Sequence, residues 1–236
     1  MRSMWIALLA SVSLLIPVPS YGRRKMHAHN RSSPPGEAGM FPYRQGWLGA
    51  DGAYSVSTGN GKSLWFLADT FTGPADATSR TQATGFIHNL TAISTCAGMN
   101  CAFRYYWQGI NTAHTGPVFS APGKDWFWPM DSFIYKGTLY IALMQMHASG
   151  TGAFGFAYSG SQLASICNYK APPSQWDIRY QQLNTGGDVV PGVSIVVDQG
   201  PGGNPDPSNS NGANYAYFFT KAGRPIWRCS VFHSQT

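Results

Sequence analysis

Glycine and proline interrupt this chain too often for long helices to form. The 236 residues include 27 Gly and 16 Pro, and no helical apolar pattern of any length runs between them. Aromatic residues make up 14% of the chain and charged residues only 11%, a composition that argues against disorder. The only long apolar run is N-terminal, which argues against a polytopic membrane protein. These features also argue against helix bundles and coiled coils, and they predict an all-β fold.

Residues 1–22 have the pattern of a secretory signal peptide. Arg2 gives a positive start, residues 4–16 are apolar but too short to span a bilayer, and residues 17–22 break the run. An N-terminal membrane anchor is the alternative. Residues 23–45 are predicted to form a flexible basic linker. We therefore expect a secreted or periplasmic protein with no stable membrane insertion after signal cleavage.

Short strand pairs with tight turns recur from Gly46 onward. Gly59-Asn60-Gly61 can supply the positive φ angles that a hairpin needs, and Lys136-Gly137 marks a second turn. The repetition favours a β-propeller, with a β-sandwich as the alternative. The recognisable strand pairs are residues 53–58 with 63–68, the unit 131–143, and residues 193–197 with 214–220 across a Gly- and Pro-rich insert at 200–212.

The length of the folded part limits the number of propeller blades. Gly46 to Thr236 is 191 residues, and a four-stranded blade takes about 40 to 50 residues, so three or four blades fit. A complete five-bladed ring does not. We expect residues 46–236 to form one propeller domain of the five-bladed type that is incomplete at its C-terminal end, with a compact four-bladed form as the alternative.

Two of the few acidic residues face each other across the first predicted hairpin. If the turn centres on Asn60, antiparallel partners have residue numbers that add to 120, which places Asp51 opposite Asp69. When two carboxyl groups are held close together, their pKa values move apart, so that one stays ionised while the other keeps its proton. Acid/base catalysis requires such a pair. The alternative is structural, since each Asp could cap a strand end in an Asx-turn. If the pair is catalytic, its spacing leans towards a retaining glycosidase.

Three further polar residues are candidates for binding substrate beside this pair. Asp131 begins the second strand unit, where Asp51 begins the first, and equivalent strand starts of a propeller converge on one face. His88 and Asn89 follow a predicted strand and could bind substrate hydroxyls or tune a pKa. A repeated structural cap is the alternative for Asp131.

Two aromatic clusters are predicted at a cleft, because sugar rings present C–H faces that stack on aromatic side chains. One is the run from Arg104 to Trp107, and the other is Trp126-Phe127-Trp128. Arg104, Trp107 and Trp128 are the candidate substrate-binding residues of these clusters. Core packing is the alternative for most of the aromatic residues.

The motifs around the aspartate pair resemble a known family. The strings GWLGADGAYS (46–55) and GKSLWFLADTF (61–71), with His88-Asn89 and FWPMD (127–131), are similar to secreted bacterial five-bladed β-propellers. This family was long a domain of unknown function and includes endo-D-arabinanases. The resemblance implies that Asp51 and Asp69 lie at the propeller centre as a catalytic pair. The chain departs from the family at Ala68, where Gly is usual, and at Leu90, where Ser is usual.

Other chemistries lack their sequence signatures. The chain has no G-x-S-x-G elbow, no P-loop and no dinucleotide-binding fingerprint in a strand-to-helix setting, and no ligands at zinc spacing, so we expect no cofactor and no metal. Cys96 and Cys101 are close enough in sequence for a small-loop disulfide in an exported protein. Pairing of Cys167 with Cys229 stays open.

The net charge of +6 resides mostly outside the folded part. From Gly46 onward there are ten Lys and Arg against nine Asp, a difference of +1, so the charge does not indicate a nucleic-acid partner. We expect a monomeric, secreted glycoside hydrolase that acts on a polysaccharide or glycoconjugate, with an arabinan-like glycan as one candidate. Asp51 and Asp69 would be the nucleophile or base and the acid. A non-catalytic carbohydrate-binding propeller is the alternative.

Overall fold

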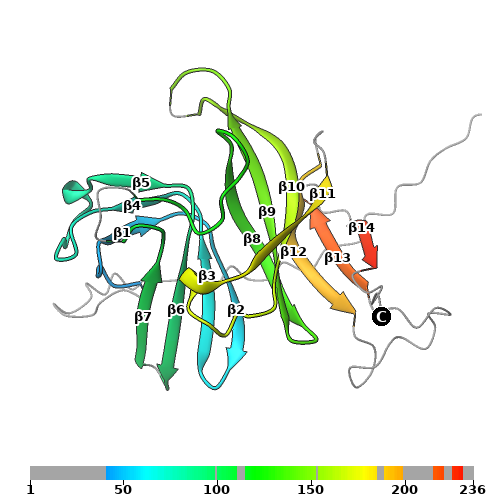
Figure 1. Cartoon of the computed structure of the whole chain (residues 1–236), viewed down its shortest axis with the longest axis horizontal. Helices are drawn as coiled ribbons and strands as arrows, with labels where there is room; N and C mark the ends of the chain where they lie inside the picture. Colours follow the sequence, from blue (N-terminus) through cyan, green and yellow to red (C-terminus); the bar gives the residue numbers. More distant parts are fainter. Residues whose placement is uncertain are drawn as a thin grey trace, which may run out of the picture. The chain divides into compact units, whose positions relative to one another are not determined.

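The protein is built almost entirely from β-strands, as a computed structural model shows (Figure 1). The structure describes residues 41–230 except 99, 111–114, 153, 185–188, 199–214 and 221–224. The predicted signal peptide, most of the predicted linker and the insert at 200–212 lie outside the described residues. The all-β prediction is confirmed.

The strands are β1 (Trp47–Ala50), β2 (Ala53–Gly59), β3 (Lys62–Leu67), β4 (Thr70–Thr72), β5 (Gly85–Ile87), β6 (Leu90–Ala97), β7 (Asn100–Tyr106), β8 (Trp126–Tyr135), β9 (Thr138–Ala148), β10 (Phe156–Ile166), β11 (Ile178–Asn184), β12 (Pro191–Asp198), β13 (Tyr215–Thr220) and β14 (Pro225–Ser230), with the 3-10 helices η1 (Arg80–Gln82) and η2 (Pro173–Gln175).

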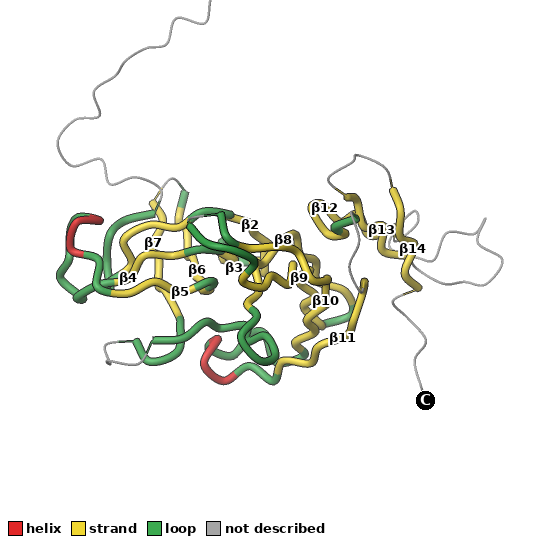
Figure 2. Tube along the Cα trace, turned by 90° about the horizontal axis from the view of Figure 1, so that it is seen from above, coloured by secondary structure: helices red, strands yellow, loops and turns green. Residues whose placement is uncertain are grey.

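Three antiparallel sheets follow one another along the chain (Figure 2). Their strand orders are β2-β3-β6-β7, β8-β9-β10-β11 and β12-β13-β14. The predicted hairpins are confirmed, since β2 pairs with β3, β8 with β9, and β12 with β13. At the first turn a Cβ atom on Gly61 would lie 2.5 Å from the carbonyl oxygen of Cys96. Only glycine fits there, and its φ of 70° agrees.

The first strand of each of these sheets contacts the next sheet. β2 and β3 contact β8, and β12 contacts β8 and β9. An apolar core joins the first two sheets, with Leu64 and Phe66 of β3 in one buried cluster with Phe127, Ile141 and Ile166. Burial of this apolar surface fixes β8 beside the first sheet. The residues that alternate with the core positions along β8 are therefore held close to the start of β2.

A small fourth sheet, ordered β1-β4-β5, is a bent continuation of the first sheet. Ala50 pairs with Thr70 in the small sheet, and Ala53 pairs with Leu67 in the large one, so both pairs have numbers that add to 120. The pairs Thr70 with Ile87 and Leu67 with Leu90 likewise both add to 157. The register thus continues through the bend, and Figure 1 shows the small sheet at a steep angle to β2, β3 and β6.

The cysteines follow the prediction in part. Cys96 and Cys101 form a disulfide across the β6–β7 hairpin, which confirms the small-loop pairing. Cys167 is an exposed free thiol, so it is not paired with Cys229. Within the part of the chain that the structure describes, no helix has the length and apolar character to cross a bilayer.

Candidate active site at the sheet bend

Asp51, Asp69 and His88 lie at the three points where the chain passes between the small sheet and the first large sheet. The register on both sides of the bend aligns Asp51 with Asp69 and Asp69 with His88, but these three residues are not themselves ladder pairs, and Asp51 is hydrogen-bonded to both Ala68 and Asp69. The Asp51 amide donates to the Asp69 carbonyl oxygen at 3.0 Å, and the Ala68 amide donates to the Asp51 carbonyl oxygen at 2.9 Å. Cross-strand neighbours project to the same face. The bend therefore brings the three side chains together.

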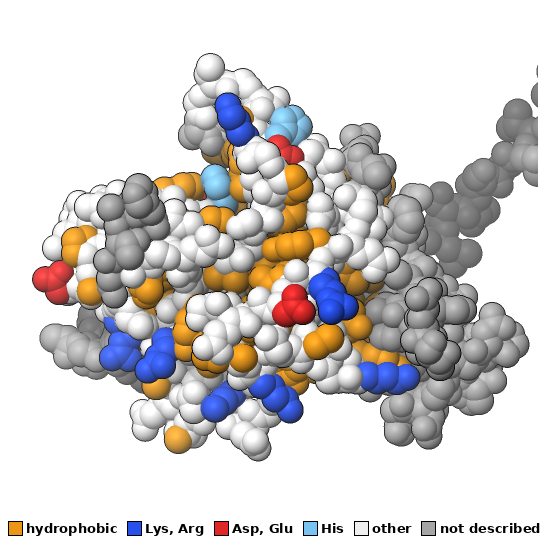
Figure 3. All heavy atoms as spheres, in the orientation of Figure 1, with side chains coloured by type: hydrophobic (Ala, Val, Ile, Leu, Met, Phe, Trp, Pro, Cys, Tyr) orange, Lys and Arg blue, Asp and Glu red, His pale blue; other side chains and the backbone are white. Residues whose placement is uncertain are grey.

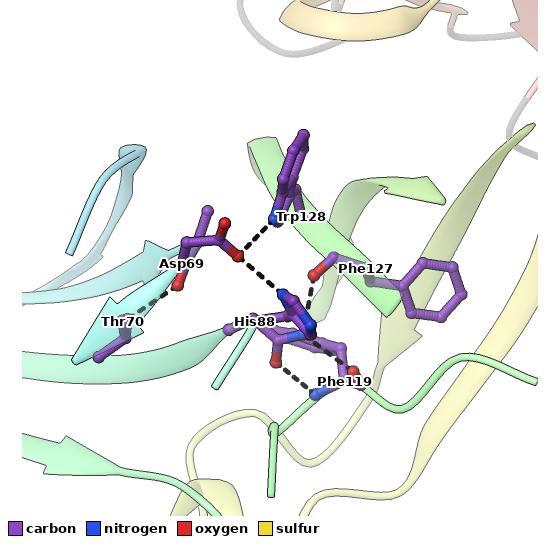
Figure 4. Close-up of polar contacts among 8 residues, drawn as sticks. Asp69, Thr70, His88, Phe119, Phe127 and Trp128 are labelled. Atoms are coloured by element: carbon purple, nitrogen blue, oxygen red, sulfur yellow. Dashed lines mark hydrogen bonds and ion pairs between the residues drawn. The ribbon is translucent and has the colours of Figure 1, made fainter. Parts of the chain in front are cut away.

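The Asp69 carboxylate is held by two ring nitrogens (Figure 4). The Nε1–H of Trp128 donates to Oδ1 of Asp69 at 2.7 Å, and Nδ1 of His88 lies 2.9 Å from the same oxygen. When the Asp69 carboxylate is ionised it can only accept, and Nδ1 of His88 is then the atom that carries the hydrogen. The Nε2 atom of His88 then serves as an acceptor in the neutral ring. Asp69 and His88 are 24% and 35% exposed, so both remain accessible to a ligand.

Asp51 differs from Asp69 in its surroundings. Its side chain is largely exposed. Partial burial, and then the negative charge of Asp69, raise the pKa of Asp51 above its ordinary value. Two neighbouring carboxyl groups thus have different environments, one with a raised pKa and the other bonded to N–H donors. Such a pair can supply an acid and a base.

A strip of aromatic rings runs through this site. Phe71 and Phe86 are cross-strand partners in the small sheet, and both are exposed (41% and 48%). The ring of His88 stacks on Trp126 with centroids 4.4 Å apart. Each ring contacts the next along the strip. The order is Phe71, Phe86, His88, Trp126, Trp128, Phe156 and Phe154.

Asn89 is not placed to bind substrate, so that prediction is wrong. Its side chain is fully buried. The amide donates to the carbonyl oxygens of Phe119 and Phe127 at 2.9 Å each, and it accepts from the Phe119 amide at 2.8 Å. Asn89 therefore positions its neighbours, because it ties the start of β6 to β8, which carries Trp126 and Trp128.

Asp131 is an inter-sheet tie, which corrects its prediction as a substrate-binding residue. One carboxylate oxygen accepts from the Ser132 amide at 2.8 Å, and the other accepts from the Ile195 amide of β12 at 2.7 Å. Both oxygens are thus engaged by the backbone. Burial raises the pKa of Tyr54 on β2, and the negative charge of Asp131 raises it further. Asp131 therefore lies near β2.

Arg104 and Trp107 do not join the aspartate pair. Trp107 is 7% exposed and packs in a core cluster with Trp47, Leu90 and Tyr105, and it lines a cavity away from the aspartate pair, so it is not a sugar platform beside that pair. Arg104 is exposed on β7, where it lines a separate cavity. Of the predicted site residues, the structure brings together Asp51, Asp69, His88 and Trp128.

The sequence analysis missed the outer rings of the aromatic strip, Phe71, Phe86, Phe154 and Phe156. A signal exists for two of them, because in TFT (70–72) and GFI (85–87) the aromatic residue is the exposed middle residue of a strand. Only the pairing of β4 with β5 reveals that these two residues face each other. Among the described residues, no group of three or more His, Cys, Asp or Glu side chains could hold a metal ion.

Comparisons with known proteins give a family and a distant structural likeness. The model of the family called "Domain of unknown function (DUF5005)" matches residues 39–187. A crystal structure titled as a "putative hydrolase" from Bacteroides ovatus ATCC 8483 is 12% identical, with a TM-score of 0.47. The match covers 80% of this chain but only 56% of that one. No curated protein matches the chain.

Proposed function

The chain belongs to the DUF5005 family, and since that name carries no activity, we propose from the geometry of the bend that it is a glycoside hydrolase. The observation that carries the proposal is the row Asp51, Asp69 and His88, in which the two carboxyl groups have different surroundings. Hydrolysis of a glycosidic bond by most glycosidases needs such a pair, one protonated and one ionised.

Each residue of the row has a role in this proposal. Asp51, with its raised pKa, is the general acid that protonates the leaving oxygen. Asp69 is the nucleophile or base, and Trp128 and His88 position its carboxylate. Positions opposite each other across an antiparallel pair have Cβ atoms about 4.5 to 5.5 Å apart. Carboxyl groups about 5 to 5.5 Å apart would give a retaining course, in which Asp69 forms a covalent glycosyl intermediate that water then hydrolyses.

The aromatic strip supports a polysaccharide or glycoconjugate as the substrate. Sugar rings stack on aromatic faces, and the exposed rings continue on both sides of His88 towards Phe71 and Phe154. A chain of sugars could therefore contact the strip on both sides of the Asp pair. An arabinan-like glycan is the first candidate, because the sequence motifs around Asp51 and Asp69 resemble a family that includes endo-D-arabinanases.

The arrangement of the sheets supports the proposal of a β-propeller of the five-bladed type. Each large sheet is an antiparallel array, and the first strand of one sheet contacts the first strands of the next. Successive blades of a propeller are related in this way. We also propose that residues 1–22 direct export, so that the enzyme acts outside the cytoplasm as a monomer without a stable membrane anchor.

Hydrolysis assays on a panel of neutral and acidic polysaccharides test the proposal, with arabinan included. We expect Asp51→Asn and Asp69→Asn each to lower turnover by at least about a thousandfold, because each removes a group that must transfer a proton or attack. Asp76→Asn, an exposed residue in another loop, serves as the matched control. The anomer released first, followed by NMR, reports the retaining course. Turnover that survives both substitutions would contradict the catalytic pair.

A non-catalytic carbohydrate-binding protein is the second candidate, because the exposed aromatic strip alone could hold a glycan. Under this alternative the wild-type protein binds a polysaccharide of the panel without cleaving any of them. Substitution of Phe86 by Ala would then weaken binding, while Asp51→Asn would leave it unchanged.

A further inference from the structure

A second hollow in the surface lies away from the bend, against β7 and the outer part of the first large sheet. It consists of two adjoining cavities of about 630 and 670 Å³, which share Gln45, Arg104 and Tyr106 in their walls. Neither Asp51, Asp69, His88 nor Trp128 lines them. We name this hollow the basic groove and define it by Arg44, Lys62, Arg104, Lys170, Tyr106 and Trp176.

The floor of the groove is one face of the first sheet. Lys62, Thr95 and Ala102 lie in one cross-strand row, and Ile93 and Arg104 lie in the next row. The opposite wall is formed by residues 170–174 with Trp176 and Ile178, around η2. Because paired strands are about 4.8 Å apart, Lys62 and Arg104 stem from positions about 10 Å apart or more.

The groove is positively charged and lacks counter-charges. Arg44, Lys62, Arg104 and Lys170 are exposed, and the described residues in the walls of the two cavities include no Asp or Glu. The ion pairs found among the described residues are His88 with Asp69 and Arg179 with Asp177, so these four cations have no carboxylate partner there. Figure 3 shows Lys and Arg side chains gathered in the lower half of the face that it displays.

We propose that the basic groove is a second glycan-binding site that holds a segment of an acidic polysaccharide. The cations stem from positions too far apart to converge on one small anion, but they suit charges repeated along a chain. Tyr106 and Trp176 offer partly buried aromatic faces for sugar rings. Gln45, Gln108 and Ser174 add hydrogen-bonding groups for hydroxyls. The ligand's anionic groups are carboxylates or sulfates, both of which Arg and Lys bind through charge-assisted hydrogen bonds.

The inference rests on the proposed function only for the choice of a polysaccharide as the ligand class. A nucleic acid also carries repeated negative charges. However, residues 41–236, which include Arg44, have a net charge of only +2, from eleven Lys and Arg against nine Asp, whereas non-specific nucleic-acid binding depends on a strong excess of positive charge. A local patch with aromatic and amide groups is better suited to a glycan.

Binding measurements on the full chain carrying Asp69→Asn test the site, because this variant should not cleave its ligand. The probes are polygalacturonate for carboxylates, heparin for sulfates, arabinan as a neutral polysaccharide, and single-stranded DNA. We expect one or both acidic polysaccharides to bind, and Arg104→Glu and Lys170→Glu each to weaken that binding by about tenfold or more. Lys124→Glu, which reverses an exposed cation outside the groove, should leave it unchanged.

The outcomes separate this inference from the proposed function. Absence of binding to both acidic polysaccharides, equal binding by Arg104→Glu, or tighter binding of DNA than of either acidic polysaccharide would overturn the inference. Hydrolysis of a neutral polysaccharide by Arg104→Glu is measured in parallel, in the background that keeps Asp69. Lost groove binding with intact hydrolysis supports two separate sites. Intact groove binding in a protein that hydrolyses nothing contradicts the proposed function alone.

Discussion

The bend and the basic groove are both polar and aromatic, yet their polar groups are held in opposite ways. At the bend, the Asp69 carboxylate accepts a hydrogen bond from Trp128 and lies against His88. Asn89, which follows His88 in the chain, is fully buried and makes three hydrogen bonds with backbone groups. In the groove, Arg104 and Lys170 are exposed and have no carboxylate partner among the described residues. Side chains held in one position, as at the bend, are suited to catalysis, because a reaction needs its groups in a defined geometry. Exposed cations without a carboxylate partner, as in the groove, can adapt to the position of a bound ligand.

The difference is the reason why we propose separate roles for two clusters that both contain aromatic and polar residues. The bend forms where three chain segments leave one sheet and enter another, so its side chains belong to rigid strand ends. The groove forms on an outer sheet face, so long cationic side chains extend from it into solvent. Four predictions follow from this contrast, in order of expected size.

The largest effect is expected on stability, from Asn89→Ala. This change leaves two buried carbonyl oxygens and one buried amide without their side-chain partner, and we expect the free energy of unfolding to fall by about 3 kcal/mol. Lys62→Ala in the groove should change it by no more than about 0.5 kcal/mol. Urea unfolding followed by tryptophan fluorescence measures both. If both substitutions lowered the free energy of unfolding by similar amounts, the bend would not be more rigidly held than the groove.

The next effect is expected on turnover, from Trp128→Phe. Phenylalanine keeps an aromatic ring but loses the N–H that donates to Asp69, so we expect kcat to fall about tenfold with little change in KM. The pH profile should also move, which loss of packing alone would not cause. Trp65→Phe is the matched control, since it removes an indole bond to Ser94 far from Asp69 along β3. An equal fall in kcat in both variants would argue against a positioning role for Trp128.

Local patterns predicted the fold at the level of strands and hairpins. The turn at Gly59-Asn60-Gly61 predicted a hairpin whose paired residue numbers add to 120. In the structure the turn itself pairs Gly59 with Lys62, which add to 121, and a register shift between Ser57 and Gly59 restores the sum of 120 for the pairs from Ser57 to Ala53. The pairs on the two sides of the bend, Ala50 with Thr70 and Ala53 with Leu67, both have residue numbers that add to 120. The bend between Asp51 and Ala53 therefore does not shift the register. Gly52, with a φ of 53°, is a local sign of the bend on this strand.

The rest of the site depends on contacts between distant segments. His88 joins Asp69 because β4 pairs with β5 across an intervening loop, and no local pattern specifies this pairing. Asn89 and Asp131 have the same polar groups as ligand-binding residues, and only the buried backbone groups that face them show that they are structural. Trp107 likewise could be assigned to the core only once its neighbours were in place.

A smaller effect distinguishes the two regions by their response to salt. Raising NaCl from about 20 to 200 mM shortens the distance over which exposed charges interact, so binding of an acidic polysaccharide to the groove should weaken several-fold. Hydrolysis of a neutral polysaccharide at the bend should change little, because its Asp69 contacts are short and partly buried. Titrations and initial rates at both salt concentrations measure this. Parallel responses would indicate that one region performs both tasks.

The smallest effect is expected from Asp51→Asn on stability, and its sign separates a catalytic acid from a structural cap. Burial and then the charge of Asp69 raise the pKa of Asp51 in the folded protein, so the native state binds this proton more tightly than the unfolded state does. The cost of ionising Asp51 is absent below the unfolded pKa of about 3.9 and develops as the pH rises through the folded pKa. Asp51→Asn should therefore raise the free energy of unfolding at neutral pH, with no gain below about pH 3.9. Urea unfolding at several pH values measures this, with Asp76→Asn as the control. A loss of stability at neutral pH would instead show that the Asp51 carboxylate caps the strand, and the proton donor would then have to be sought elsewhere on the aromatic strip.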